Sequence, residues 1–579
     1  MKPKHENSKV KIDKGRVNKM RISTMNMIYE GINRMTRVKP SGRSLLRQFL
    51  LGVLTVGITG CLGFGDKNSE VPRGNIGYVQ GTLGGIAVDE PRAALVGRDV
   101  LASGGNAVDA ATAAFFALTV TLPSSVSLGG GGLCLVRDSK TQMVETLDFR
   151  VKLSKSAGNN PRTAAVPGNP RGIFALHAKY GTMKWAELVR PAEHLARYGT
   201  EISRSMGQDL KIAKRDIWPD PEMRRIFATK GASSFYKETE FIRQVDLSTL
   251  LARISAHGAS DLYAGTYARQ FVEAVQSSGP GFSYDELHSY LPVWRKTIEV
   301  NFIKGTAFHF PLSTNSAGAT SAQIMGMVAF RGRFEGMNQV ERAHLIAEAT
   351  ERSLADQQRW RLSNFDTSQI VSSDTTKQLL LTFKENKRVP TVGKILAPIE
   401  VLAKSRGASL VVIDSKGGAV ACAFSMNIPF GVGRVAKGTG VVLSAQPPVT
   451  EDPLAVVMLV SKIGNRMFYA SGASGGAVAP SAMINVIARG IADSGGNLEG
   501  AMSAKRVHHG GADGITYLER GIAPAIVNGL GALGHKMAYV RNLGYVNAIF
   551  CPSGIPVKKG VDCAVRSDHR GFGLGVGSD

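Results

Sequence analysis

The sequence predicts a mixed α/β domain whose sheets are covered by helices. Residues 410–413 and 419–424 are two short apolar runs joined by the polar, glycine-ended turn 414–418, as expected for a β-hairpin. Neither run alternates polar with apolar residues, which is typical of strands that are buried on both faces. A nearly all-apolar helix is predicted after Asn106, and a helix of this kind belongs in a buried layer.

The composition is that of a globular protein with a basic N-terminal leader. The chain has 579 residues, 43% of them hydrophobic, and a formal net charge of +24. Residues 1–47 hold thirteen Lys and Arg side chains against Glu6, Asp13 and Glu30. A basic nucleic-acid-binding protein is expected to interleave aromatic with basic residues, and this pattern is missing. The leader is therefore interpreted as a targeting segment, and no nucleic-acid partner is predicted.

An apolar run of twelve residues, 49–60, follows the basic segment. It is too short to cross a bilayer as a helix but suits the core of a signal peptide. The run ends in Ile58-Thr59-Gly60-Cys61, which resembles the bacterial lipobox and predicts a lipid anchor on Cys61. The alternative is an ordinary signal peptide with a chance cysteine. Residues 1–60 are thus assigned to a leader, with Met35 as a possible true start, and 61–80 to a flexible tether.

Further elements follow from local patterns. Asn106 is expected to cap the apolar helix, with Asp109 near the positive end of the helix dipole. The glycine run 129–132 lacks the Lys-Ser/Thr of a phosphate loop. The segment 377–406 is basic and is predicted to be irregular. The other predicted strands are 84–89, 133–137, 144–149 and 466–470, and the other helices are 90–102, 168–180, 185–198, 344–360 and 480–490.

The cysteines and histidines give no metal pattern. Cys134 and Cys422 lie within apolar strands and are predicted to be buried small residues. Cys551 and Cys563 flank a turn-rich segment and could pair in an oxidising compartment. No C-x-x-C spacing occurs, and the side chains of the adjacent pair His508-His509 diverge on a strand. We therefore expect neither a metal site nor a cofactor.

Several motifs occur in an order that resembles the γ-glutamyltransferase family, also called γ-glutamyltranspeptidases or glutathione hydrolases. They are residues 104–111 (Gly-Gly-Asn-Ala-Val-Asp-Ala-Ala), 147–150 (Leu-Asp-Phe-Arg), 410–427, 471–476, 506–509 and 567–570. The resemblance covers about residues 81–575. It implies the four-layer αββα sandwich of the N-terminal nucleophile hydrolases over residues 81–579. The large-subunit-like part would be 81–406 and the small-subunit-like part 407–579.

The resemblance also implies where a site would lie. In the family, a Thr-Thr-His triplet precedes the central hairpin, and its first Thr is both the self-cleavage site and the nucleophile. Here Gly407-Ala408-Ser409 occupies those positions. The positions carried over by motif are Arg150 for the substrate carboxylate, Ser425 for a Thr that supports the nucleophile, Asn427 and Gln446 for polar substrate ligands, and Gly475 and Gly476 for the oxyanion hole.

Several functional groups of the family are missing. Gly407 has no side chain that could attack a carbonyl. Val449 stands where an acidic residue should bind the substrate amino group, and Ala455-Val456 replaces a Ser-Ser pair. Losing a nucleophile and its partners removes most of the rate enhancement of an enzyme. The sequence therefore predicts a membrane-anchored, extracytoplasmic relative without self-cleavage or catalysis, which binds an amino acid, a γ-glutamyl compound or a protein partner.

Two alternative hypotheses, in which the protein is an active enzyme, compete with this prediction. An active γ-glutamyltransferase could use Ser409 or Ser405, each two residues from Gly407, although such a shift moves the hydroxyl about 6–7 Å along a strand. Residues 472–476 also fit the nucleophile-elbow pattern G-x-S-x-G, which would make Ser474 the nucleophile of a serine hydrolase. The sequence leaves both alternatives open.

Overall fold

The computed structural model describes residues 78–82, 84–157, 160, 162–231, 233–303, 305–312, 317–334, 336–360, 365–391, 407–447, 454–491, 497–557 and 563–577. The chain divides into two compact units, Met1–Val71 and Pro72–Asp579, and the described residues all belong to the second. The predictions for Cys61, Ser405 and Val449 lie outside the described residues.

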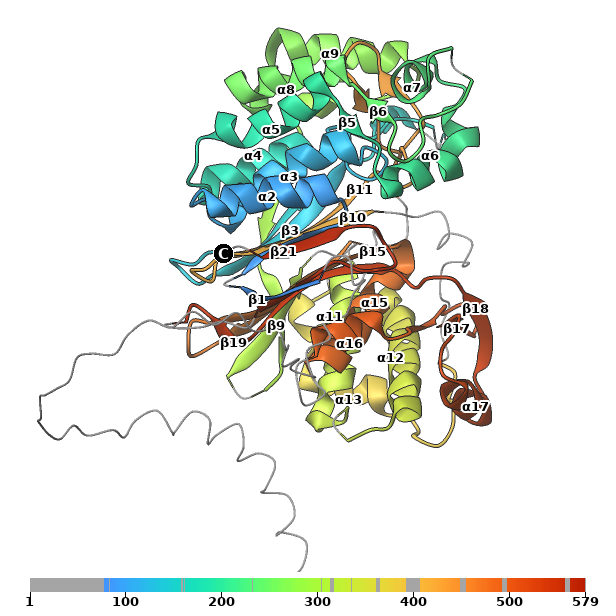
Figure 1. The fold of residues 1–579 in the computed structure, drawn as a ribbon. Helices are drawn as coiled ribbons and strands as arrows, with labels where there is room; N and C mark the ends of the chain where they lie inside the picture. Colours follow the sequence, from blue (N-terminus) through green and yellow to red (C-terminus); the bar gives the residue numbers. More distant parts are fainter. Residues whose placement is uncertain are drawn as a thin grey trace, which may run out of the picture. The chain divides into compact units, whose positions relative to one another are not determined.

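In the described part of the chain, two seven-stranded sheets pack face to face (Figure 1). The first sheet has the order β21 (Leu574–Gly577), β2 (Gly85–Val88), β10 (Ala408–Ile413), β11 (Ala419–Ser425), β3 (Gly131–Arg137), β4 (Val144–Phe149) and β7 (Val293–Arg295). The second has the order β1 (Tyr78–Thr82), β20 (Cys563–Arg566), β19 (Tyr545–Ile555), β15 (Met467–Ser474), β14 (Ala455–Ser461), β9 (Thr306–Pro311) and β8 (Thr297–Asn301). Both sheets thus mix strands from before and after Gly407.

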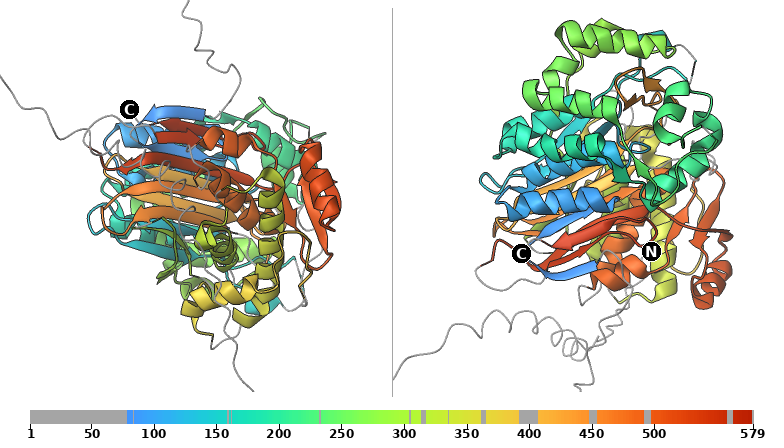
Figure 2. Two further views of the ribbon diagram at one scale, coloured as in Figure 1. Left: turned by 90° about the horizontal axis from the view of Figure 1, so that it is seen from below. Right: turned by 45° about the horizontal axis from the view of Figure 1, so that its top comes forward.

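Helices cover the outer face of each sheet (Figure 1). The first sheet carries α2 (Pro91–Ala102), α3 (Ala107–Thr121) and α4 (Asn169–Tyr180), with α5 (Trp185–Tyr198) and α8 (Val245–His257) stacked outside them. The second sheet carries α11 (Ala317–Ala329) and α15 (Ala479–Gly490), with α12 (Gln339–Trp360) and α16 (Leu498–Ser503) packed on these. In the right view of Figure 2 the blue helices α2 and α3 again lie on one side of the strands. The predicted four-layer αββα sandwich is confirmed.

The remaining elements are short or peripheral. The helices are α6 (Arg204–Ile217), α7 (Pro221–Phe227), α9 (Gly265–Ser277), α10 (Tyr284–His288), α13 (Ser373–Leu380) and α17 (Pro524–Ala532). The strands are β5 (Thr200–Glu201), β6 (Phe241–Ile242), β12 (Val435–Ala436), β13 (Val441–Val442), β16 (Val507–His509), β17 (Ile515–Glu519) and β18 (Lys536–Val540). Since α13 extends to Leu380, the segment predicted to be irregular from residue 377 begins as helix. Among the described helices, none is both long and apolar enough to cross a membrane.

The strands β10 and β11 lie between two apolar cores. Leu410 and Val412 pack toward the helices, whereas Val411 and Ile413 pack into the core between the sheets. Successive side chains of a strand point to opposite faces, so a strand buried on both faces needs apolar residues at every position. This arrangement explains why the two hairpin strands lack polar alternation.

The hairpin is anchored by the side chain of Asp414. Strands β10 and β11 pair from Ala408 opposite Phe424 to Ile413 opposite Ala419, which confirms the predicted hairpin. The Asp414 carboxylate accepts hydrogen bonds from the N–H groups of Lys416 and Gly418 in the turn, at 2.9 and 2.8 Å. It also accepts one at 3.0 Å from the N–H of Ala107, the first residue of α3. One side chain therefore fixes the turn and ties it to the N-terminus of the apolar helix.

The N-terminus of α3 has the predicted cap. The Asn106 side chain accepts from the N–H of Asp109, and the Asp109 carboxylate accepts from the N–H of Asn106, which makes a reciprocal capping box. Asp109 is fully buried and also accepts hydrogen bonds from the hydroxyl and the N–H of Thr182. The motif at residues 104–111 therefore has a structural role at this position.

Two disulfides join neighbouring strands. Cys551 in β19 pairs with Cys563 in β20, as the sequence suggested. Cys134 in β3 pairs with Cys422 in β11; both are buried, as predicted, but their disulfide was not predicted. The register places Cys134 directly opposite Cys422, although 288 residues separate them in the sequence. Sequence spacing gives no sign of such a pairing because the sheet register creates it.

Candidate functional site

Gly407, which the resemblance assigns to the nucleophile position of the family, lies at the start of β10, beside the end of β11. Gly407 immediately precedes β10, and a Cβ built on it would lie 2.6 Å from the carbonyl oxygen of Phe424. Ser425, the last residue of β11, pairs with Gly131 of β3. A Cβ on Gly131 would in turn lie 2.9 Å from the Cα of Arg150. Three positions from distant parts of the sequence, Gly407, Ser425 and Arg150, therefore meet at the same end of neighbouring strands of the first sheet.

Asn427 and Gln446 join the same group through backbone hydrogen bonds. The N–H of Asn427 donates to Ser425 Oγ at 2.7 Å, and its side-chain Nδ2 donates to the carbonyl of Ala445 at 2.7 Å. Gln446 Nε2 donates to the carbonyl of Thr163 at 3.0 Å, and its Oε1 accepts from the N–H of Ser154 at 3.2 Å. Both amides therefore brace the loops around the site.

Arg150 forms a two-pronged ion pair with Asp148. Its Nε and Nη2 lie 3.0 and 2.8 Å from the two carboxylate oxygens of Asp148, and the Arg150 side chain is only 17% exposed. Burial opposes ionisation of Asp148, but the hydrogen bonds and the charge of Arg150 outweigh it and lower the pKa of that carboxyl. A ligand carboxylate that approached Arg150 would have to share the guanidinium with Asp148.

Gly475 and Gly476 follow β15 at the turn into α15. Both have positive φ angles, 118° and 75°, which favour glycine. A Cβ on Gly475 would lie 2.8 Å from the Cα of Gly544, so the two backbones pack without room for a side chain. The residue before them, Ser474, faces Gly407: a Cβ on Gly407 would lie 3.8 Å from the Cβ of Ser474. The expected oxyanion glycines are thus adjacent in sequence to the residue that faces Gly407.

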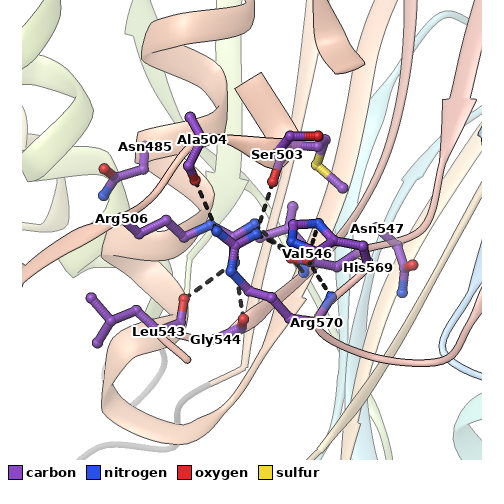
Figure 3. A network of polar contacts seen from close by, with 12 residues as sticks. Asn485, Ser503, Ala504, Arg506, Leu543, Gly544, Val546, Asn547, His569 and Arg570 are labelled. Carbon is purple, nitrogen blue, oxygen red and sulfur yellow. Dashed lines mark hydrogen bonds and ion pairs between the residues drawn. The ribbon is translucent and has the colours of Figure 1, made fainter. Parts of the chain in front are cut away.

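A buried ionic network supports this turn (Figure 3). Arg506 donates to the carbonyl of Gly544 at 2.9 Å and pairs with Asp568 at 2.5 Å. Arg570 binds the opposite oxygen of Asp568 at 3.2 Å and binds Glu519 at 2.6 Å. Because Gly544 packs against Gly475, this network holds the surface against which the glycine turn rests. The motifs at 506–509 and 567–570 therefore supply packing support for the site.

A small polar cavity of about 10 Å³, roughly the space of one water molecule, adjoins Gly407. Its lining residues are Asp89, Leu122, Ser125, Ser205, Asp209, Gly407, Ser474, Tyr545 and Gly571. The carboxylate of Asp89 accepts from the N–H of Ser409 at 2.8 Å and from Nδ2 of Asn547 at 2.9 Å. Sequence reasoning missed Asp89 and Asn547, since neither belongs to a motif that carries chemistry by itself.

The structure places Ser409 inside the sandwich. Its side chain is fully buried, and its Oγ donates to the carbonyl of Gly472 at 3.2 Å and accepts from Asn547 Nδ2 at 2.9 Å. The peptide N–H and carbonyl of Ser409 are also engaged, with Asp89 and Asn547 respectively. An attack by this hydroxyl on an external substrate would require the strand to open.

A serine hydrolase that used Ser474 would need a base, and four histidines follow Ser474 in the sequence: His508, His509, His535 and His569. All four have other partners. Ser474 is buried and its Oγ lies 3.5 Å from Asp89. His508 contacts Ser481, His509 contacts Arg388, His535 contacts His344 and Thr516, and His569 lies beside Asp568. None of these histidine contacts involves Ser474.

Ala455 and Val456, which the resemblance aligns with a Ser-Ser pair of the family, begin β14 and are fully buried. Ala455 packs into the helix-side core of the second sheet, and Val456 into the core between the sheets. Neither side chain can offer a hydrogen bond to a ligand. Both positions contribute to core packing.

The chain was compared with known families, proteins and structures. The family model described as gamma-glutamyltranspeptidase matches residues 93–448 and 453–574. The glutathione hydrolase proenzyme of Escherichia coli (strain K12) is 28% identical over 524 residues, which cover 81% of this chain and 88% of that protein. The glutathione hydrolase proenzyme of Pseudomonas aeruginosa is 28% identical over 550 residues, covering 85% and 94% of the two chains.

A solved structure gives the same fold. The crystal structure of cephalosporin acylase from Bacillus halodurans has a TM-score of 0.73 and covers 90% of this chain and 100% of that one, at 20% identity. At that identity the likeness supports the fold alone. The family model, in contrast, matches most of the sequence on both sides of Gly407. The chain therefore belongs to the gamma-glutamyltranspeptidase family.

Proposed function

We propose that this chain is a lipid-anchored, extracytoplasmic member of the family that neither cleaves itself nor transfers γ-glutamyl groups. In this proposal its site is a weak binding site for a γ-glutamyl compound or an amino acid, or a contact site for a protein partner. The observation that carries the proposal is the glycine at residue 407, where the resemblance places the nucleophile of the family.

The first support is chemical. In the family, the Thr hydroxyl attacks the carbonyl before it, which here belongs to Arg406, and the resulting ester is opened by water. Gly407 has no oxygen with which to begin this step. Without cleavage there is also no new α-amino group to act as the base. A single substitution thus removes the nucleophile and its base together.

The second support is steric. The Cβ of any residue other than glycine at position 407 would lie 2.6 Å from the Phe424 carbonyl oxygen, closer than real Cβ atoms approach a neighbour. The obstacle is backbone of β11, which cannot rotate away as a flexible side chain can. Strand β11 therefore occupies the space that a threonine side chain at residue 407 would need. This is what we expect of a site that is not arranged for nucleophilic attack.

The binding side of the proposal rests on the remaining polar groups. Arg150 is engaged by Asp148, and the amides of Asn427 and Gln446 hold backbone groups. Ala455 and Val456 add no polar contact. A buried or half-buried polar group that already has hydrogen-bond partners binds a ligand well only if the ligand replaces those hydrogen bonds without a loss of free energy. We therefore expect at most weak affinity for glutamate or glutathione.

The extracytoplasmic location is supported by the disulfides and by the leader. Disulfides persist in oxidising compartments and are rare in the cytosol of mesophiles. The pairs Cys134–Cys422 and Cys551–Cys563 use all the cysteines that follow Cys61. This leaves Cys61, in its lipobox-like setting, as the cysteine available for lipidation.

The competing proposal is an active enzyme with a relocated nucleophile or a serine hydrolase. The complete burial of Ser409 and the contacts of Ser474 argue against both. Ser405 lies outside the described residues, and its assignment rests on the sequence alone.

The steric argument predicts different responses of two glycines to alanine. Gly407→Ala is expected to lower the free energy of unfolding by about 1–3 kcal/mol, because overpacking against a fixed backbone forces a shift. The control Gly326→Ala in α11 meets only Thr376 Oγ1 at 3.6 Å and is expected to be neutral or to stabilise the protein by about 0.5–1 kcal/mol. Chemical denaturation of the two variants measures the difference. Equal unfolding free energies would contradict the steric argument.

The chemical argument predicts no turnover of a chromogenic γ-glutamyl anilide by the purified protein. Gly407→Thr should not reach the activity of a glutathione hydrolase assayed alongside, because Ala408, Val449 and Ala455-Val456 remain changed. Release of the anilide is measured by absorbance against an enzyme-free blank.

Turnover well above that blank would refute the proposal. Its source would then be assigned by substitution: loss in Ser409→Ala or Ser405→Ala would identify a relocated nucleophile, and loss in Ser474→Ala a serine hydrolase.

The lipid anchor predicts the behaviour of a Cys61→Ser variant expressed in a bacterium. Without the thiol no lipid can be attached, so this variant should move from the membrane to the soluble extracytoplasmic fraction. The control Thr59→Ser keeps a small residue before the cysteine and should stay with the membrane. Fractionation and immunoblotting measure both. Membrane association that is unchanged in Cys61→Ser would exclude anchoring through this residue.

A further inference from the structure

A second group of polar residues lies far from Gly407 in the fold, where α12 meets the C-terminal segment that carries β16, β17 and β18. His344, Glu348 and His535 each place one metal-ligand atom within 4.8 Å of the others. Their exposed fractions are 1%, 0% and 5%, so all three are buried. Two imidazoles and a carboxylate are one of the ligand sets that proteins use for zinc and other transition metals.

The fold brings these side chains together. His344 and Glu348 are four residues apart on α12, one above the other on the same face of the helix. His535 immediately precedes β18, whose neighbour β17 pairs with β16, and β16 packs against α12. No metal pattern is visible in the sequence because 191 residues separate His535 from His344.

In each imidazole, the ring nitrogen that does not face the other histidine has a defined partner. His344 Nε2 lies 2.8 Å from the carbonyl oxygen of Lys384, which can only accept, so this nitrogen carries the proton. His344 Nδ1 is then unprotonated, and its lone pair faces His535 Nε2 at 2.7 Å. His535 Nδ1 lies 2.8 Å from the Thr516 hydroxyl. Metal-bound histidines typically use their second nitrogen in this way, which fixes the ring orientation.

The carboxylate of Glu348 is only half satisfied. Its Oε2 binds Arg352 at 2.7 Å, whereas its Oε1 has no hydrogen-bond partner in the described part of the structure. A buried carboxylate oxygen without a partner is costly, and each such case calls for an explanation. A cation bound at the cluster would supply the missing interaction, while Arg352 would orient the carboxylate.

A surface cavity adjoins the cluster. The cavity has a volume of about 470 Å³ and is lined by Phe330, Arg331, Gly332, Arg333, Gly336, Met337, Glu341, His344, Phe383 and Glu385. His344 is thus both a wall of this cavity and a member of the cluster. A metal site requires an entry path, and this cavity reaches one of the three ligand residues.

The fixed charges next to the cluster are paired. Glu348 pairs with Arg352, and Glu351 pairs with Arg388, so the charges of these four side chains balance.

We propose that His344, Glu348 and His535 bind one divalent transition-metal ion, for which Zn²⁺ is the best-suited probe. The ligand nitrogens of tetrahedral zinc lie about 3.3 Å apart, given Zn–N distances of roughly 2.0–2.1 Å. Binding would therefore replace the shorter His344–His535 hydrogen bond and move the two rings slightly apart. The His535 proton passes from Nε2 to Nδ1 and is donated to Thr516, so no proton is released. Water completes the coordination, and the ion ties α12 to the C-terminal segment.

The test uses the full chain without a histidine tag, treated with a chelator and then titrated with Zn²⁺ alone. We expect one zinc per chain by elemental analysis after desalting, and a rise in the melting temperature on zinc addition, since binding to the folded state stabilises it. Co²⁺ should give the visible absorption of a tetrahedral site. Glu348→Gln keeps an oxygen for Arg352 and should weaken zinc binding at least tenfold, as should His535→Asn. The control His569→Asn, whose side chain is 41% exposed, should bind like the wild type.

Three results would overturn the proposal. The first is that the wild type retains no zinc and shows no zinc-dependent rise in melting temperature. The second is that Glu348→Gln binds zinc as tightly as the wild type. The third is that His569→Asn loses as much affinity as the cluster variants, which would place the ion elsewhere. If His535→Asn does not fold, the wild-type titration and Glu348→Gln still decide the outcome.

Discussion

The burial of the β10–β11 hairpin on both faces is the constraint on which the site depends. A slip of one residue would turn every side chain of a strand to the opposite face, so the register is strongly specified wherever both faces are packed. Leu410 and Val411 already occupy separate cores, and Asp414 holds the turn against α3. A slip of two residues, which would bring Ser409 to the position of Gly407, keeps each side chain on its face but would break the hydrogen bonds of Asp414 to the turn and to α3.

The same constraint would maintain the fold in a chain without the family's chemistry, as we propose for this one. The cores on either side of the hairpin consist of aliphatic and aromatic side chains, and none of their packing requires a hydroxyl at residue 407. Ala455 and Val456 extend those cores. The ionic network of Arg506, Asp568 and Arg570 supports the glycine turn. The residues that hold the architecture therefore differ from those that the proposal assigns to the lost catalysis.

Local patterns predicted much of the fold. The hairpin, the Asn106 cap, and the helices and strands that flank them follow from apolar periodicity and turn chemistry within short windows. The resemblance to the family predicted the four layers and indicated that Arg150, Ser425, Asn427 and Gln446 lie close together. What sequence reasoning missed is non-local: the Cys134–Cys422 disulfide, the contacts of Asp89 with Ser409 and Asn547, and the meeting of His344 with His535. Sheet register and helix packing create these contacts, and no short window contains both partners.

The central claim is that a chain with glycine at position 407 cannot cleave its own backbone there. Intact mass spectrometry of the purified protein, carrying a C-terminal tag and incubated under conditions in which a glutathione hydrolase proenzyme matures, tests this claim most directly. The account predicts one polypeptide that retains both the large-subunit-like and the small-subunit-like parts. Two fragments divided before Gly407 would contradict it, and a new N-terminus at Ser409 would show that the nucleophile has moved.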